Sequence, residues 1–377
     1  MEKTIEGSAA IAETTKNCNP DVVACFPITP STHIAEDLNK LHSDGEIRDF
    51  IPVEAEFSSI SAIMGASAAG ARAFSTTSSQ GLALMHEAMF CAAGMRLSPV
   101  MVVANRALSA PLNIWNDHQD SVSERDSGWI QLFCESNQEA CDTIPQAFKV
   151  AEKAGLPAMV CIDGFYLTHA VEQIDIPEKE VIDKFLPKFN PEVKLDPENP
   201  LSLGVYAFPE HYQGFRKDLF DDLGRSKEDI RKAHDEWAQL TGRKYGDGLI
   251  EKYMLEDAEC VFIGMGSVIG NAKEAVDEMR ASGKKVGVLK VRSYRPFPGK
   301  EIANSIAGKK VAVFEKAVSM GGEAPIYSEV MAAVGENDSG AVVSSFIGGL
   351  GGKDVTVNHV KGILDKISGG KPFKEWV

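Results

Sequence analysis

Short apolar runs alternate with stretches of helical periodicity in the first half of the chain, and this alternation predicts strands separated by helices. Helices are expected at Phe57–Gly70 and Gly81–Met95, where serine and glycine stand at the junctions. The predicted strands are Asp21–Phe26, Phe50–Val53, Ala73–Thr76, Pro99–Ala104 and Leu156–Ile162. Strands that alternate with helices favour a parallel sheet flanked by helices, so an α/β domain is expected over residues 1–177.

The pattern changes after residue 177. Residues 178–250 are rich in proline and charged side chains, and they predict an extended connector with one helix at Asp218–Thr241. A second α/β unit is expected over residues 251–377. Its predicted strands are Cys260–Met265, Lys285–Val291 and Lys310–Phe314, and its predicted helices are Asn271–Ser282, Pro325–Val334 and His359–Ser368.

Composition narrows the class of protein. The 377 residues are 44% hydrophobic and 25% charged, which gives enough apolar material for a core in each unit. The net charge of −15 and the lack of a basic patch argue against partners such as nucleic acid or an anionic membrane. No apolar run approaches the roughly 20 residues of a membrane-spanning helix, and the N-terminus does not resemble a signal peptide. A soluble, cytoplasmic protein is therefore expected.

The cysteines point away from a metal centre on this chain. There are seven, they are scattered, and several lie in apolar runs, as reduced buried cysteines do. No two of them have the C-x2-C spacing that is typical of zinc and iron–sulfur ligands, so the sequence predicts neither centre here.

Thr29 lies in the segment FPITPST that follows the first predicted strand, between Pro27 and Pro30. The prolines fix the backbone and block an immediate helix. Ligands of open α/β sheets bind at loops that follow the carboxyl ends of strands, so the Thr29 hydroxyl suits a carboxylate or phosphate oxygen. The alternative is a structural turn in which Ser31 or Thr32 caps the next helix.

Glu54 and Glu56 stand in the segment PVEAE, at the junction between an apolar strand and a helix of small residues. A carboxylate at a helix N-terminus is stabilised by the helix dipole, so a capping role is one interpretation. In this apolar setting a carboxylate can also be desolvated and can hold or share a proton, as a catalytic group must. The spacing leaves both interpretations open.

Arg106 follows another predicted strand and offers a planar, permanently charged fork for a carboxylate. The alternative is an ion pair with Asp117 or Asp120. The polar segment Asn113–Trp129 that comes next is typical of a loop that covers a site or a subunit contact. Within that segment, a surface or structural role is favoured for His118 over a catalytic one.

Two glycine-rich segments lie in the second unit. Gly264–Gly270 (GMGSVIG) does not match the dinucleotide-binding spacing, and it predicts a tight turn from a strand into a helix. Phe346–Gly352 (FIGGLGG) permits another backbone to approach closely, because glycine has no side chain to obstruct it.

Several motifs, in this order, resemble those of the alpha subunits of pyruvate:ferredoxin oxidoreductases, within the 2-oxoacid:ferredoxin oxidoreductase family. The matching segments span nearly the whole chain. They are Pro27–Ser31 (PITPS), Pro52–Glu56 (PVEAE), Thr77–Leu84 (TSSQGLAL), Asn105–Pro111 (NRALSAP), Trp115–Asp117 (WND), Arg125–Leu132 (RDSGWIQL), Ser293–Pro298 (SYRPFP) and Ile347–Thr356 (IGGLGGKDVT).

The resemblance implies a thiamine pyrimidine-type parallel-sheet domain followed by an α/β domain similar to the C-terminal domain of transketolase. It implies an enzyme that oxidatively decarboxylates pyruvate to acetyl-CoA and CO2, or runs in reverse, and exchanges electrons with ferredoxin. In heteromeric members a beta subunit carries thiamine diphosphate, Mg2+ and an iron–sulfur cluster. Gamma and delta subunits or their equivalents contribute CoA binding and further clusters, and the complex is expected to be a dimer of heteromers.

The sequence agrees with a cofactor that is held mainly on partner chains. Gly246–Gly248 (GDG) and Asn271 come nearest to the motif that binds the magnesium diphosphate of thiamine. No apolar strand precedes the GDG, however, and the asparagine stands alone, so we reject this match.

Carried onto this sequence, the resemblance assigns Glu56 as the carboxylate on N1′ of the thiamine aminopyrimidine. It assigns Thr29 and Arg106 as the groups that bind the substrate carboxylate. Relatives that act on 2-oxoisovalerate share most of these motifs, including a tryptophan like Trp115, and Ala110 stands where many pyruvate enzymes have glycine. A branched 2-oxoacid enzyme and a non-catalytic assembly subunit are therefore the alternatives.

Overall fold

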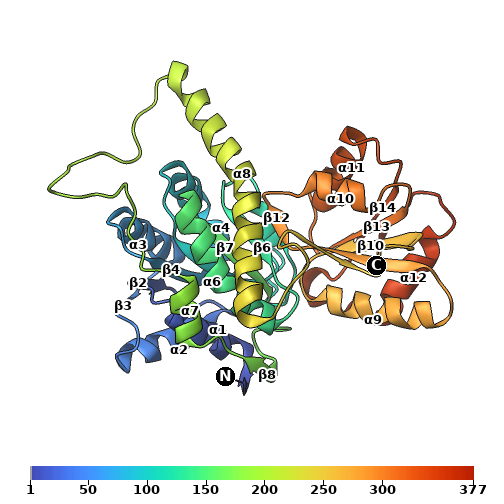
Figure 1. Ribbon diagram of the computed structural model, residues 1–377, viewed down its shortest axis with the longest axis horizontal. Helices are drawn as coiled ribbons and strands as arrows, with labels where there is room; N and C mark the ends of the chain where they lie inside the picture. Colours follow the sequence, from blue (N-terminus) through green and yellow to red (C-terminus); the bar gives the residue numbers. More distant parts are fainter. Residues whose placement is uncertain (1) are drawn as a thin grey trace.

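The computed structural model describes residues 2–377, and its two main sheets are flanked by helices (Figure 1). The first sheet runs in the order β12 (Ser293–Arg295), β6 (Ile130–Phe133), β7 (Ala158–Asp163), β5 (Val100–Asn105), β4 (Ala73–Thr77), β2 (Val22–Cys25) and β3 (Asp49–Pro52). The second runs in the order β15 (Lys374–Trp376), β14 (Val342–Ile347), β13 (Lys310–Glu315), β10 (Cys260–Gly264), β11 (Val286–Val291) and β9 (Ile250–Tyr253). A separate antiparallel pair joins β1 (Glu2–Glu6) to β8 (Val171–Asp175). The predicted α/β class with two parallel-sheet units is confirmed.

The strands of the first sheet are parallel apart from β12, which pairs antiparallel with β6. Each strand predicted in the first half is present, and so are the two predicted helices, as α3 (Glu56–Ala68) and α4 (Ser79–Gly94). The pattern gave no bounds for α1 (Gly7–Asn17), α2 (Thr32–Ser43), the short α5 (Gln119–Ser123) or α6 (Asn137–Ala154). Pro145 lies inside α6, where a proline normally argues against a helix.

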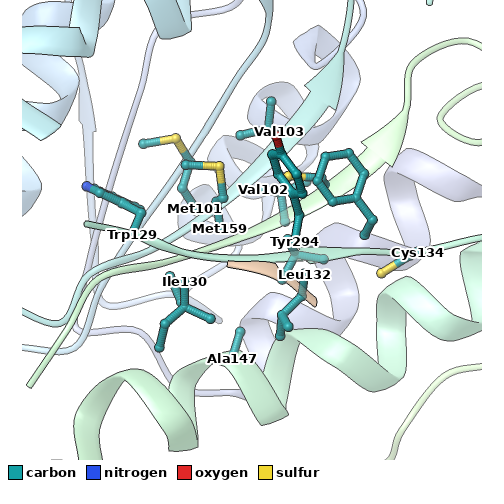
Figure 2. Packing of buried hydrophobic residues seen from close by; sticks show 14 of the residues in the cluster. Met101, Val102, Val103, Trp129, Ile130, Leu132, Cys134, Ala147, Met159 and Tyr294 are labelled. Carbon is teal, nitrogen blue, oxygen red and sulfur yellow. The ribbon is translucent and has the colours of Figure 1, made fainter. Parts of the chain in front are cut away.

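The main core lies between the first sheet and its helices. β5 and β7 are buried along their whole length, which is why they are continuous apolar runs rather than alternating ones. Figure 2 shows Met101, Val102 and Val103 of β5 packed among side chains that include Tyr294 from β12. The same apolar cluster continues into the second unit, where it includes Val261 of β10.

The second sheet is covered on both faces. Figure 1 shows α10 (Gly299–Ser305) and α11 (Pro325–Glu336) on one face, and α9 (Val268–Ala281) and α12 (Val357–Ile367) on the other. α9 and α12 pack against each other over an apolar cluster with β10, β11 and β13. The strands and helices predicted for this unit are all present, with bounds shifted by a few residues.

The segment between the units contains α7 (Lys179–Phe185) and α8 (Pro209–Thr241). α8 begins nine residues before the predicted Asp218 and ends at Gly242, whose φ of 75° is left-handed. Its second half packs on α6, and Trp237 is buried against Phe185 with ring centroids 4.9 Å apart. Its first turns and the preceding loop extend away from the body (Figure 1). Across residues 2–377, no helix has both the length and the apolar composition needed to span a bilayer.

The chain passes directly from a strand of the second sheet to a strand of the first. β11 ends at Val291 and β12 begins at Ser293, and Arg292 between them is fully buried. The Arg292 guanidinium donates to Oε1 of Glu139 (3.1 Å) and to the carbonyl oxygen of Gly248 (2.8 Å). The first three residues of the SYRPFP motif, Ser293–Arg295, therefore form a strand that completes the first sheet.

A buried ionic network lies beside this crossing. Nζ of Lys290, which is 1% exposed, donates to Glu139 (2.6 Å), Glu135 (2.8 Å) and Glu251 (3.3 Å). Burial by itself lowers the pKa of a lysine, but these three carboxylates hold the pKa of Lys290 above its ordinary value. Lys290 belongs to the second sheet and Glu139 to α6, so the network joins the two units.

We predict that Lys290→Met lowers the free energy of unfolding by about 3–5 kcal/mol, because it removes one of the two cations that neutralise the fully buried Glu139 and leaves that carboxylate with Arg292 alone. Urea denaturation followed by circular dichroism measures the change. The matched control is Lys179→Met, which removes an exposed i,i+4 pair with Asp183 and should cost less than about 0.5 kcal/mol. Equal losses for the two variants would contradict a role for the network in joining the units.

Candidate functional site

The carboxyl ends of four neighbouring strands carry the candidate site. β5, β4, β2 and β3 are adjacent and parallel, so the loops that follow them leave the same edge of the first sheet. Arg106 directly follows β5, Thr29 lies in the loop after β2, and Glu56 begins α3 after β3. The three predicted site residues therefore lie at one edge, where ligands bind in open α/β sheets.

The Arg106 side chain is buried, yet it pairs with no carboxylate among residues 2–377. Its Nε donates to the carbonyl oxygen of Asn113 (2.9 Å) and its Nη1 to the carbonyl oxygen of Thr29 (3.0 Å). Asp120, one of the two alternative partners, accepts the backbone N–H of Arg106 instead of its guanidinium (2.9 Å). Burial lowers the pKa of Arg106, and the charge of Asp120 opposes that shift. The result is a fixed cation that lacks an anion.

The loop after β2 presents Thr29 at the surface, and the Thr29–Pro30 peptide is cis. The Ser31 hydroxyl donates to the carbonyl oxygen of Ile28 (2.8 Å), and no side chain caps the start of α2. The capping role considered for Ser31 and Thr32 is therefore not formed. The loop is instead held from the other side, where the Thr29 carbonyl accepts Arg106.

Glu54 and Glu56 occupy different environments. Glu54 is exposed and accepts the Ser58 hydroxyl (2.5 Å), which lowers the pKa of Glu54. Glu56 is only 7% exposed and packs closely on Gly81, where an added Cβ would lie 2.6 Å from Glu56 Oε1. Nothing within residues 2–377 donates a hydrogen bond to the Glu56 carboxylate, and α3 has no side-chain cap. Glu56 is therefore a buried carboxylate that can accept a hydrogen bond from a bound ligand. The hydrogen bond to the first turn of α3 is made by Glu54 instead.

Asp120 connects the loops of the site, a role that the sequence did not reveal. Its Oδ2 accepts the backbone N–H groups of Ser79 (2.9 Å) and Arg106 (2.9 Å), and its Oδ1 accepts Asn105 Nδ2 (2.7 Å). Burial raises the pKa of Asp120 to about 6, and the donated hydrogen bonds oppose that rise. Asp120 thus fixes the end of β5 against the start of α4.

The second unit holds the loop that follows β5. Asn113, whose carbonyl binds Arg106, donates from Nδ2 to the carbonyl oxygen of Gly351 (3.0 Å). The φ of Gly352 is 82°, in the left-handed region, and a Cβ added to this glycine would lie 2.4 Å from Cβ of Trp115. The close approach predicted for the FIGGLGG segment is confirmed, and it positions the Arg106 loop.

A buried carboxylate joins the two units beneath this loop. Asp163, at the end of β7, accepts Lys316 Nζ (2.9 Å) and the Ser267 hydroxyl (2.6 Å), and it lies 2.7 Å from His118 Nε2. Although burial tends to raise it, Lys316 and His118 hold the pKa of Asp163 well below its ordinary value. His118 is thus buried and has a structural role, which is one of the two roles that the sequence favoured for it. Ser267 follows Gly266 (φ 71°) in the strand–helix turn predicted for GMGSVIG.

Two family models match the chain. The model described as "Pyruvate flavodoxin/ferredoxin oxidoreductase, thiamine diP-bdg" matches residues 13–235. The model described as "Pyruvate:ferredoxin oxidoreductase core domain II" matches residues 258–360. The chain belongs to the pyruvate:ferredoxin oxidoreductase family.

Relatives within this family match over nearly their full length. The pyruvate synthase subunit PorA of Methanothermobacter thermautotrophicus is 46% identical over 100% of this chain and 97% of its own. PorA of Pyrococcus abyssi is 47% identical over 96% and 92%. The ketoisovalerate oxidoreductase subunit VorA of Pyrococcus abyssi is 43% identical over 97% and 93%. The resemblance inferred from the motifs is confirmed.

Solved structures agree with the fold. A 2-oxoglutarate:ferredoxin oxidoreductase from Magnetococcus marinus superposes with a TM-score of 0.73 at 20% identity, over 97% of this chain and 65% of that chain. A split-gene transketolase matches with a TM-score of 0.50 at 15% identity, over 97% and 98%. Because the identities are low, these two matches show the fold alone. The pyruvate:ferredoxin oxidoreductase chain has two α/β domains in a transketolase-like arrangement.

Proposed function

We propose that this chain is the alpha subunit of a heteromeric complex that oxidatively decarboxylates pyruvate to acetyl-CoA and CO2 and passes the electrons to ferredoxin. The proposal includes the reverse direction, in which the complex would make pyruvate from acetyl-CoA and CO2. Membership of the family and full-length similarity to subunits named pyruvate synthase support this function. Within the site, the buried Arg106 guanidinium without a carboxylate partner carries the proposal.

Arg106 and Thr29 would bind the substrate carboxylate. Two guanidinium nitrogens of Arg106 are fixed by carbonyl oxygens, and Nη2 has no hydrogen-bond partner among residues 2–377. A charged donor in a partly dry site binds a carboxylate more strongly than a neutral donor does. The Thr29 hydroxyl lies on the same loop that Arg106 holds, and it would supply a second donor beside the carbonyl of a 2-oxoacid.

Glu56 fits the aminopyrimidine of thiamine diphosphate, because its carboxylate is buried and lacks an internal donor. A ring nitrogen at N1′ would share a proton with this carboxylate in a site of low polarity, where that interaction is strengthened. When bound, thiamine diphosphate supplies the carbon nucleophile for decarboxylation of the 2-oxoacid. Glu56 itself would hold the proton that the aminopyrimidine needs to become basic.

The remaining cofactors would be held by partner chains. The cysteine thiols are unsuited to binding iron–sulfur clusters. Cys91 is the one exposed cysteine among residues 2–377, and the others are buried. Burial raises the pKa of Cys25 and of Cys134 to about 12, which disfavours the thiolate that a metal requires. A beta subunit would carry thiamine diphosphate, Mg2+ and an iron–sulfur cluster, with gamma and delta subunits or equivalents for CoA binding and further clusters. A dimer of such heteromers is the proposed assembly.

A branched 2-oxoacid such as 2-oxoisovalerate is the second candidate substrate, because the VorA relative is 43% identical. Trp115 lies against Phe165 with ring centroids 4.6 Å apart and the rings tilted by 45°, and it follows the stretch that contains Ala110. The carbonyl oxygen of Trp115 accepts the backbone N–H of Ala107, the residue after Arg106 (3.0 Å), so these apolar groups would contact the substrate side chain rather than its carboxylate. A non-catalytic assembly role is the third candidate.

Native purification of the chain with its bound partners tests the function. The sample is analysed for iron, sulfide and thiamine diphosphate, and then assayed for CoA-dependent viologen reduction with pyruvate and with 2-oxoisovalerate. We expect a brown complex that reduces viologen fastest with pyruvate. Faster reduction with 2-oxoisovalerate would establish it as the substrate. A colourless homo-oligomer without thiamine diphosphate would contradict the proposed function.

We predict that Glu56→Gln lowers kcat of the assembled complex by about 100-fold to 10,000-fold, because an amide cannot share the proton. Size-exclusion chromatography checks that the complex still assembles. The matched control is Glu54→Gln, an exposed carboxylate two residues earlier, which should retain activity. Activity that survives Glu56→Gln would favour the assembly role.

We predict that Arg106→Lys lowers kcat/KM for pyruvate by about 10-fold to 100-fold, because lysine keeps the charge but loses the planar fork. The KM for CoA should stay unchanged, since the proposed contact is with the 2-oxoacid alone. Steady-state viologen reduction measures both constants. Arg48→Lys, at an exposed arginine away from the site, is the control. An equal effect on both KM values would contradict a specific carboxylate contact.

A further inference from the structure

Three side chains of metal-ligating type converge at the edge of the first unit. They are Glu6 at the end of β1, His33 in the first turn of α2, and His169 in the turn after β7. Their ligand atoms all lie within 4.8 Å of one another, and His33 Nδ1 lies 2.7 Å from Glu6 Oε1. Glu6 and His169 are half-buried and His33 is exposed, so solvent ions can reach the cluster.

The backbone around the cluster is fixed before any ion binds. Gly7 N–H donates to the carbonyl oxygen of Ala170 (3.0 Å), and both the N–H and the hydroxyl of Ser8 donate to the carbonyl oxygen of Thr168 (3.0 and 2.8 Å). These bonds join the residues that follow Glu6 to those on either side of His169. Two of the three side chains are therefore held on one rigid scaffold.

The buried Thr168 orients the His169 ring. Oγ1 of Thr168 lies 2.7 Å from Nδ1 of His169 and accepts the backbone N–H of Phe165 (2.9 Å). A hydrogen bond to one ring nitrogen, which leaves the other free as a ligand, is the usual outer contact of a metal-binding histidine. Here it leaves Nε2 of His169 as the available atom.

We propose that Glu6, His33 and His169 bind a divalent transition metal of the zinc class, with water in the remaining coordination position. Two imidazoles and one carboxylate form a ligand set that zinc takes in sites with an open position. Mg2+ and Ca2+ prefer oxygen ligands throughout, so the histidines disfavour them. Bonds of about 2.0 Å to zinc require ligand atoms roughly 3.3 Å apart. The exposed His33 side chain has room to make that adjustment.

The proposed site adjoins the candidate substrate site but does not depend on its function. His33 lies four residues after Thr29, and the ring of Phe165 lies between those of Trp115 (4.6 Å) and His169 (4.7 Å). A bound ion would connect the start of α2 to the turn after β7. It would therefore stabilise the fold around the Thr29 loop, which is measurable without any turnover.

The experiment uses the full chain, purified without a histidine tag and stripped with chelator. Isothermal titration with Zn2+ and visible absorption with Co2+ report binding, and thermal melting with and without Zn2+ reports stabilisation. We expect one equivalent of Zn2+, Co2+ bands of four-coordinate geometry, and a higher Tm with Zn2+. His33→Ala and His169→Ala should each lose all three signals.

Two further variants separate the site from adventitious binding. His86→Ala is the matched control, because His86 also pairs with a carboxylate, Glu124 (2.8 Å), but has no second histidine beside it within residues 2–377. It should bind Zn2+ as the original chain does. Thr168→Val should weaken binding by about 10-fold to 100-fold by removing the outer contact. Circular dichroism confirms that each variant is folded. Zn2+ binding that persists in folded His33→Ala and His169→Ala would overturn the proposal.

Discussion

The buried ion pair between Asp163 and Lys316 is the interaction on which the arrangement of the two units depends. Asp163 ends a central strand of the first sheet, and Lys316 follows β13 of the second. A buried charge without its partner is strongly destabilising, so each unit presents a group that is stable only when the other is in place. Lys316 also donates to Asn116 Oδ1 (2.9 Å), whose Nδ2 donates to the carbonyl oxygen of Asn105 (3.2 Å). The domain contact therefore reaches the residue before Arg106.

The same contact explains how a buried arginine can remain without an acid. The guanidinium of Arg106 is held by carbonyl oxygens of Asn113 and Thr29, which satisfy its donors without neutralising its charge. The loop that carries Asn113 is in turn fixed by Gly351 of the second unit. The free-energy cost of burying this cation is offset by the packing of the two units rather than by a local salt bridge. Such preorganisation leaves the charge available to a ligand.

The site on this chain is half of a catalytic apparatus in the proposed complex. Its parts are the buried guanidinium of Arg106, an exposed hydroxyl at Thr29 and a buried acid at Glu56. The chain presents these groups at one sheet edge, within the residues matched by the thiamine-diphosphate-binding family model. The second domain packs against the loop that follows β5. Its part is to fix the loops, through the IGGLGG segment and the crossing strand β12.

The sequence by itself determined the α/β class and most of the central strands, and it predicted three candidate site residues. Strands such as β5 are buried on both faces, so they appear as continuous apolar runs that need no partner to be recognised. Arg106 follows the buried strand β5, Thr29 follows the mostly buried β2, and Glu56 follows the more exposed β3, each in a short, distinctive motif. Only the tertiary structure decided that Asp120 connects two loops, that β12 joins the first sheet, and that Glu6 meets His169. Each of these depends on contacts between residues far apart in the chain, and the local pattern of apolar and polar side chains carries no record of such contacts.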